Sequence, residues 1–459
     1  MKTTRPSLPL MCQYPSSLVF PFVLAFLGAF TLLSGCEKAS GTPSSERNTD
    51  VFPPRAPEQS NDTGSGRSVG KGRGQGVIAQ RTPELLSTVR PAPLAPTPEP
   101  EPVVVLPSPA PLPVGEPEVR TPSEALVASY TRTCESARQK AAAARSTNQP
   151  PSFDADEQTA FVLYELALVR GCNDVAAALA PKEWIDLTGK QLRTTSFFEL
   201  LVNARTLLLQ RNLLSTQASL QGLKALRTLR SLSLSGNPLE DAEALMPLSG
   251  LSWLKTLALS DTSLPVDALG TLASFGALES LHLRNVRLSE EDVRSVGALS
   301  RLKVLDVSGS LVTRLPTSAR AAEREPLSLL GNLVRLREVD LTSTGATHLD
   351  FLTRATRAVE IRASGNAITA LPEKPQWTSL QALVLAENPL SSLAPLAPAP
   401  GRSANRVPAL RTLIVEGTGF DDVVTASRLT SLSYFNYKKT PAAAAQRKCP
   451  LEDWDACES

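Results

Sequence analysis

Residues 229–239 read Leu-Arg-Ser-Leu-Ser-Leu-Ser-Gly-Asn-Pro-Leu, a run in which leucines alternate with polar residues and an asparagine precedes a further leucine. Such alternation turns one side of a short strand toward a core and the intervening residues toward solvent. The pattern L-x-L-x-x-N-x-L recurs at intervals of 22 to 34 residues. Eleven units align on it, and their first apolar residues are Ile185, Leu207, Leu232, Leu257, Leu281, Leu305, Val339, Ile361, Leu383, Leu413 and Phe435. A single unit cannot bury its own leucines, so the pattern predicts a stacked solenoid.

The repeat resembles the leucine-rich repeat family over residues 183–445. The resemblance implies an α/β solenoid, with a parallel β-sheet on the concave face and short helices and loops on the convex face. In the repeat pattern, the asparagine side chain would form hydrogen bonds with buried backbone groups at the turn after the strand. Four repeats have asparagine at this position: Asn212, Asn237, Asn366 and Asn388. Lys190 and Val286 depart from the pattern, so the first unit and the unit near Val286 are the less regular ones. Residues 289–299 are expected to form a short capped helix on the convex face.

Two of the intervals are longer than the rest and predict insertions. Residues 318–326 and 397–406 are polar or proline-rich, and we expect them to project as loops. The alternative is that one of them contacts a partner.

The residues between the alternating leucines would form the concave face, where a partner would bind. The candidate partner-binding residues are His282, Arg284, Asp306, Glu338, Asp340, Glu360, Arg362, Val384, Ile414 and Asn436. The middle of this face carries charges of both signs, and a less polar patch lies beyond it. A mixed surface of this kind suits a protein partner better than a polyanion. The alternative is an ordinary solvated sheet face.

Composition weighs against an enzyme. Histidine occurs twice, which leaves little material for imidazole catalysis or for a multi-histidine metal site, and no cofactor is expected. His282 beside Asp306 could form a catalytic pair, but no activated nucleophile accompanies them in the sequence. Some bacterial proteins of the leucine-rich repeat family carry a ubiquitin-ligase domain after the repeats; here only a short cysteine-bearing segment follows.

The amino terminus predicts export. Lys2 and Arg5 precede a largely apolar run over residues 18–33, too short to span a bilayer comfortably and suited to a signal peptide. Residues 33–36, Leu-Ser-Gly-Cys, resemble the lipobox of bacterial lipoproteins. The resemblance implies cleavage of a signal peptide, residues 1–35, and lipidation of Cys36. An uncleaved anchor or an ordinary signal peptide is the alternative. Glu37 favours the outer membrane, so we expect a lipid-anchored protein of the cell envelope, facing either the periplasm or the surface.

Residues 36–122 form a predicted disordered linker, rich in proline and glycine, between the anchor and the rest of the chain. Residues 123–182 then change character and predict a hairpin of two helices joined by a disulfide, the first over residues 123–145 and the second from Asp154 to Gly171. Asp154 and Glu157 are spaced as a capping box at the start of the second helix. This hairpin would cover the open end of the repeats. A cysteine-bearing cap, residues 446–459, would cover the other end.

Four cysteines remain outside the predicted signal peptide and lipobox: Cys134, Cys172, Cys449 and Cys457. An even number in an oxidising compartment predicts two disulfides. Of the three possible pairings, proximity favours Cys134 with Cys172 and Cys449 with Cys457. A metal site is the alternative, but no C-x-x-C pair is present.

The charges nearly cancel, with 47 Lys and Arg against 45 Asp and Glu. Nucleic-acid binding needs a clustered excess of basic residues, so we expect no nucleic-acid partner. We therefore expect a monomeric, membrane-anchored lipoprotein that binds a protein partner through its concave face. A structural envelope scaffold without a ligand on that face is the alternative, and an enzyme is the least favoured reading.

Overall fold

The structure is a computed structural model that describes residues 111–115, 117, 119, 121–313, 326–398, 406–445 and 457–458. These residues belong to one compact unit, Pro98–Ser459. The predicted signal peptide, Cys36, most of the predicted linker, most of both insertions and Cys449 lie outside the described residues, and Cys457 is described in its backbone alone. Within the described part of the chain, no helix is both long and apolar enough to cross a bilayer.

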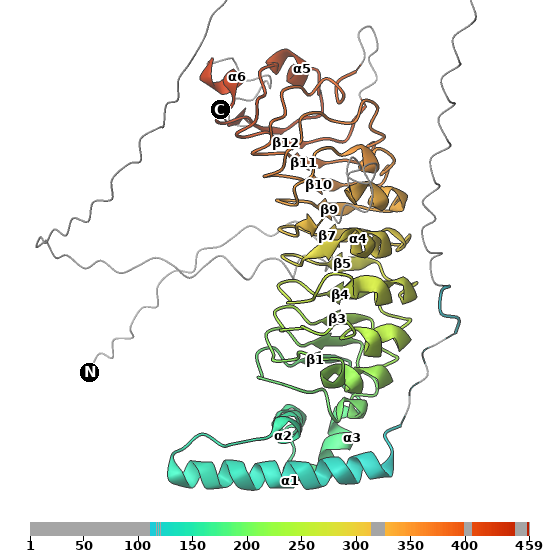
Figure 1. The fold of residues 1–459 in the computed structure, drawn as a ribbon, viewed down its shortest axis with the longest axis vertical. Helices are drawn as coiled ribbons and strands as arrows, with labels where there is room; N and C mark the ends of the chain where they lie inside the picture. The colour runs from blue at the N-terminus through green and yellow to red at the C-terminus, as the bar shows by residue number, and fades with distance from the viewer. Residues whose placement is uncertain are drawn as a thin grey trace, which may run out of the picture. The chain divides into compact units, whose positions relative to one another are not determined.

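A twelve-stranded parallel sheet runs through the molecule, and its strands follow one another in chain order (Figure 1). The strands are β1 Trp184–Asp186, β2 Thr206–Leu208, β3 Ser231–Ser233, β4 Thr256–Ala258, β5 Ser280–His282, β7 Val304–Asp306, β9 Glu338–Asp340, β10 Glu360–Arg362, β11 Ala382–Val384, β12 Thr412–Ile414, β13 Tyr434–Asn436 and β14 Cys457–Glu458. Neighbouring strands pair in the same register, so that Leu207 lies opposite Leu232, and Leu232 opposite Leu257. Eleven strands are centred on the eleven predicted apolar residues.

Short helical segments connect the strands on the opposite side of the molecule (Figure 1). They are the α-helices α4 Glu290–Gly297, α5 Val423–Ser427 and α6 Pro441–Ala444, and the 3₁₀ helices η3 Phe198–Leu200, η4 Ala218–Ala225, η5 Met246–Gly250, η6 Ala268–Ser274, η7 Pro326–Asn332 and η8 Asp350–Leu352. Two further short helices, η2 Cys172–Asp174 and α3 Val175–Leu179, precede β1. A small second sheet pairs β6 Leu288–Ser289 with β8 Val312–Thr313. The helix predicted over residues 289–299 is α4, and Ser289 caps it by accepting a hydrogen bond from Asp292 N.

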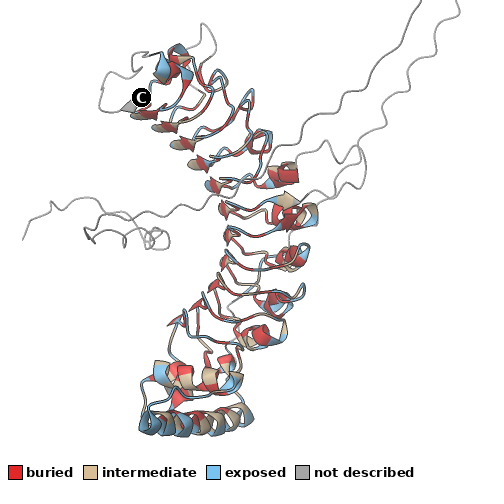
Figure 2. Ribbon diagram, turned by 60° about the vertical axis from the view of Figure 1, so that its left-hand side comes forward, coloured by how far each residue is buried: buried red, intermediate tan, exposed pale blue. Residues whose placement is uncertain are grey.

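The core lies between the two sides and continues from coil to coil (Figure 2). The middle residue of each strand is buried; Leu232, Leu257 and Leu281 are 0% exposed. Fully burying a leucine side chain contributes about 1.5–3 kcal/mol, and each coil shares that burial with its two neighbours. The chain folds as a leucine-rich repeat solenoid.

The turn asparagines tie successive coils together. The Asn237 side chain donates to the carbonyl of Leu209 in the preceding coil (2.9 Å) and to that of Leu234 in its own coil (2.8 Å). Its Oδ1 accepts a hydrogen bond from Leu214 N at 3.1 Å. Because these backbone groups are buried, leaving them unpaired would cost about 1–3 kcal/mol each.

The two irregular units keep this arrangement by other means. Near Val286, the Ser310 hydroxyl takes over from an asparagine: it donates to Leu283 O at 2.5 Å and accepts from Val286 N at 2.9 Å. In the first unit, Asn212 of the following coil accepts a hydrogen bond from Leu192 N at 3.0 Å.

Two helices, α1 Glu124–Thr147 and α2 Ala155–Ala167, precede the first strand. The predicted capping box is present: Asp154 Oδ1 accepts from Glu157 N at 2.8 Å, and Glu157 Oε2 accepts from Asp154 N at 3.1 Å. Glu157 also accepts from Lys140 Nζ (2.6 Å) and Ser136 Oγ (2.8 Å), which links α2 to α1. Burial opposes ionisation of Glu157, but these hydrogen bonds outweigh it and hold its pKa below the ordinary value.

Three details at the ends of the repeats differ from the predictions. Helix α2 ends at Ala167 rather than near Gly171, because Leu168 adopts a left-handed backbone with φ 57°. The predicted bond between Cys134 and Cys172 is present, but it joins α1 to η2 rather than two long helices. Strand β14 was not predicted; it extends the sheet by pairing Cys457 with Phe435 in the same register as the other strands.

Candidate functional site

The solvent side of the sheet, which we call the strand face, presents the first and third residues of the eleven three-residue strands from β1 to β13. In the middle of the stack, the third residues form a row from β5 to β10: His282, Asp306, Asp340 and Arg362 lie opposite one another in turn. The first residues of β9 and β10, Glu338 and Glu360, form the adjacent row. The register of the sheet therefore brings six of the predicted residues together.

Charged contacts divide this cluster into paired and unpaired groups. Arg362 Nη2 lies 2.6 Å from Glu360 Oε1, and its Nη1 lies 4.0 Å from Asp340 Oδ2. In the part of the chain that the structure describes, Glu338 is exposed and makes no ion pair. The cluster thus keeps an excess of negative charge that faces solvent.

His282 stands at one end of the row. Its Nδ1 lies 4.0 Å from Asp306 Oδ2, and its Nε2 lies 2.9 Å from Ser280 Oγ on the same strand. Burial lowers the pKa of His282, while the negative charges of Asp306 and Glu338 act in the opposite direction without overcoming it. The structure therefore favours a neutral imidazole at this position.

Serine, histidine and aspartate in a line are the residue types of a hydrolytic triad, and sequence analysis missed Ser280. A strand neighbour two positions from His282 lies on the same side of the sheet, so the spacing alone could have revealed it. The separation of 4.0 Å between His282 Nδ1 and Asp306 Oδ2 is too long for a hydrogen bond. Ser280 also lies on a regular strand, and its N–H bonds Lys255 O at 2.9 Å. The three side chains do not form a hydrogen-bonded relay.

The remaining candidates lie on either side of the cluster. Arg284 is exposed at the turn after β5, and Val384 and Ile414 are half-buried on β11 and β12. Asn436 differs from the expectation, because it is only 7% exposed. Its side chain accepts a hydrogen bond from Lys438 N at 3.1 Å and donates to Glu416 Oε2 at 3.4 Å. The available contact surface is therefore concentrated on β5 to β12.

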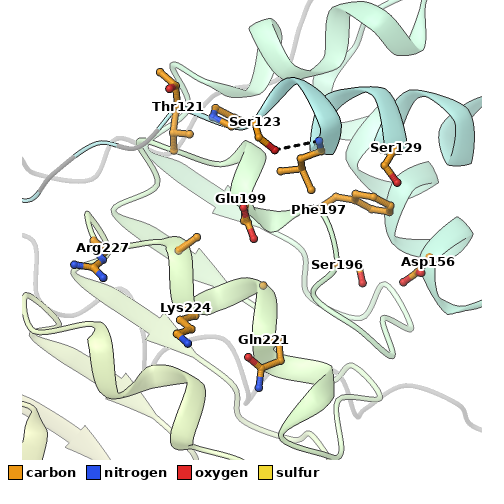
Figure 3. A pocket seen from close by; sticks show the side chains of 15 residues that line it. Thr121, Ser123, Ser129, Asp156, Ser196, Phe197, Glu199, Gln221, Lys224 and Arg227 are labelled. Carbon is orange, nitrogen blue, oxygen red and sulfur yellow. Dashed lines mark hydrogen bonds between the residues drawn. The ribbon is translucent and has the colours of Figure 1, made fainter.

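A hollow lies away from the strand face. A cavity of about 680 Å³ opens where the start of α1 meets η3 and η4, and it includes Ser123, Phe197 and Lys224 in its lining (Figure 3). Phe197 adopts a left-handed backbone with φ 67°, and its ring packs edge-on against Tyr130. None of the predicted partner-binding residues lines this hollow. Among the described residues, no cluster of histidine, cysteine, aspartate or glutamate could hold a metal ion.

No protein-family model matches the chain, and no curated protein matches it. Among solved structures, an internalin from Listeria monocytogenes is 18% identical, with a TM-score of 0.43 over 64% of this chain and 93% of that chain. Internalin C2 from the same species is 19% identical, with a TM-score of 0.34 over 61% of this chain and 91% of that one. The fold assignment rests on this chain's own strand pairing and leucine core.

Proposed function

We propose that the protein is a binding module that holds a protein partner through the strand face between β5 and β12. The observation that carries the proposal is the row of His282, Asp306, Asp340 and Arg362, which four successive strands hold in register toward solvent. Because the strands are fixed by a continuous core, these side chains are presented with little loss of entropy on binding.

The surroundings of the row fit a protein partner. Half-buried Val384 and Ile414 add apolar area beside the charges, and interfaces combine an apolar centre with polar groups at the rim. Charges of both signs would set the orientation of the partner and raise its association rate.

The proposal is tested by crosslinking capture from envelopes of the cells that produce the protein. The full chain is compared with a variant that carries His282→Ala, Asp306→Ala, Asp340→Ala and Arg362→Ala. These residues are solvent-facing, so the variant should remain folded. A partner that is captured by the native protein and lost from the variant is the expected result.

A matched control removes exposed charges from the segments between the strands: Glu243→Ala, Glu291→Ala and Lys374→Ala. Capture should survive these changes. Equal capture by the native protein and the strand-face variant would defeat the proposal and favour a scaffold role, in which the linker or the loops make the contacts.

We also propose that the chain is anchored in the cell envelope by a lipid on Cys36, on the strength of the lipobox-like residues 33–36. Cys36 would carry a diacylglyceryl group on its thiol and a third acyl chain on its amine, and stable anchoring needs only two such membrane signals. Metabolic labelling with a fatty acid should mark the native protein and not a Cys36→Ser variant. Equal labelling of both would refute the anchor.

A further inference from the structure

A second charged surface borders the strand face. The residue directly before each of the eleven strands from β1 to β13 of this sheet is also at least partly exposed, and before six of them it is basic: these residues are Arg205, Arg230, Lys255, Lys303, Arg337 and Arg411. Several have partners within the protein. Lys303 pairs with Glu279 at 2.7 Å, and the guanidinium of Arg230 lies over the Trp253 ring at 4.5 Å.

In the coils of β7, β9 and β10, Arg301, Arg335 and Arg357 each lie three residues before their strand, and the strand register gives them equivalent places in successive coils, while Arg337 lies directly before β9. This arginine patch consists of Arg301, Arg335, Arg337 and Arg357. Arg335, Arg337 and Arg357 are exposed, and Arg301 is half-buried. Within the described residues, none of the four takes part in an ion pair, whereas Arg205 in the same edge pairs with Glu183 at 3.3 Å.

The patch carries positive charges that no ion pair within the described residues neutralises. Adjacent strands of a sheet lie about 4.8 Å apart, so the guanidinium groups repel one another within a Debye length of roughly 8–10 Å. An anion that binds there would relieve the repulsion. The planar fork of arginine matches a carboxylate with two parallel hydrogen bonds, which makes it a better carboxylate ligand than lysine.

The neighbouring residues restrict what that anion can belong to. Arg337 is followed directly by Glu338, an exposed carboxylate without an ion pair in the described chain, and Glu338 lies opposite Glu360. A basic row therefore borders an acidic row. A polymer of one sign, such as an acidic polysaccharide or a nucleic acid, would be repelled by the second row as it bound the first, whereas a polypeptide can carry both signs.

The patch is also short. Among the residues that directly precede the strands, Lys303 and Arg337 form a basic run of two. Glu279 interrupts it on one side, and uncharged Val359 and Gln381 interrupt it on the other. A long polyanion would need an unbroken basic path. A few carboxylates of a folded partner need only the three coils that the patch covers.

We propose that the arginine patch binds a short acidic segment of the protein partner, while an adjoining basic segment of that partner faces Glu338 and Asp306 on the strand face. The inference rests on the proposed function, because it specifies the charge pattern of the same partner.

The direct test uses a fluorescent peptide with four glutamates followed by three lysines, titrated with the full chain at low salt and followed by anisotropy. The variant Arg335→Gln, Arg337→Gln, Arg357→Gln should bind it at least about tenfold more weakly, since close charge pairs couple by about 1.5 kcal/mol or more. The control Arg205→Gln, Lys255→Gln, Arg411→Gln removes the same charge from the same edge and should change binding by less than about threefold. Thermal melting verifies that both variants fold.

Several results would overturn the inference. The first is that the peptide does not bind at low salt, and the second is that both triple variants weaken its binding equally. The third is that an oligouronate or a single-stranded oligonucleotide binds more tightly than the mixed peptide. Crosslinking capture separates this inference from the proposed function. Loss of the partner in the strand-face variant alone would refute the patch and keep the proposed function. Loss in the patch variant alone, or in neither variant, would refute the proposed function and, with it, the inference that rests on it.

Discussion

The side chains of His282 and Ser280 lie on one strand and meet at 2.9 Å between Nε2 and Oγ, in a part of the strand face where the imidazole is half-buried. Burial makes the charged form of His282 unfavourable and lowers its pKa from 6.5, although Asp306 and Glu338 partly counteract the effect. The folded state therefore binds this proton less readily than the unfolded chain does.

The stabilising contribution of neutral His282 should be complete above the unfolded pKa and should be lost as the pH falls from about 6.5 through the lower, folded pKa. Replacing the imidazole removes this loss, so the free energy of unfolding of His282→Gln should fall less on acidification than that of the native protein. Urea denaturation at a series of pH values from 7.5 to 5 measures the difference. Parallel pH profiles for the two proteins would contradict the shift.

Asn388 should be among the costliest single residues to truncate. Its amide donates to Ala363 O at 2.8 Å and to Leu385 O at 2.9 Å, and its Oδ1 accepts from Ile368 N at 3.0 Å. Asn388→Ala leaves these buried groups unpaired and should cost about 2–4 kcal/mol in the free energy of unfolding.

Threonine is the matched control at this position. Thr418 occupies the same place in a later coil, and its hydroxyl makes contacts in its own coil alone: it donates to Val415 O at 2.7 Å and accepts from Phe420 N at 3.3 Å. Asn388→Thr should therefore recover part of the loss, about 1 kcal/mol. Equal urea midpoints for the alanine and threonine variants would show that the contact within the coil contributes nothing.

Gly222 is required by a close approach between two coils. A Cβ atom at this position would lie 1.8 Å from Thr195 O, and the Gly222 N–H bonds Thr195 Oγ1 at 3.0 Å. Gly222→Ala should force the coils apart and cost about 2–3 kcal/mol or more. Gly270 lies in the corresponding helical segment with nothing within 4 Å of its added Cβ, so Gly270→Ala should change stability by less than about 1 kcal/mol. Thermal melting of both variants tests the contrast, which similar melting temperatures would refute.

The strand positions could be predicted because the buried face of each strand is encoded by one residue type at a fixed interval. Leu232, Leu257 and Leu281 occupy identical places, and a one-residue slip would expose all of them. Strand β14 escaped prediction because the position that pairs with Phe435 holds Cys457 in place of a leucine. The end of α2 escaped because the left-handed conformation of Leu168 has no signal in the sequence.

The candidate site could be predicted in part. Alignment on the repeat placed His282, Asp306 and Asp340 in one row, since that row follows from register alone, even across the insertion before β9. The arginine patch was missed because simple alternation assigns only every second residue to the strand face. At the start of β10 and its neighbours the alternation breaks: Arg337 O accepts hydrogen bonds from both Val359 N (2.7 Å) and Glu360 N (3.0 Å), so two consecutive residues turn outward.

The disulfide between Cys134 and Cys172 should stabilise the helical cap far more than the strands remote from it. It closes a loop with a sequence separation of 38, for which the loss of chain entropy in the unfolded state predicts on the order of 3–4 kcal/mol. In a solenoid each coil contacts only its neighbours, so the cost should fall on α1 and the first coils. Hydrogen exchange should accelerate at the amides of α1 in Cys134→Ala, Cys172→Ala and remain unchanged in β9. A matched variant, Cys449→Ala with Cys457→Ala, should leave exchange in α1 as it is in the native protein. Uniform acceleration along the whole chain would show instead that cap and repeats unfold as one cooperative unit.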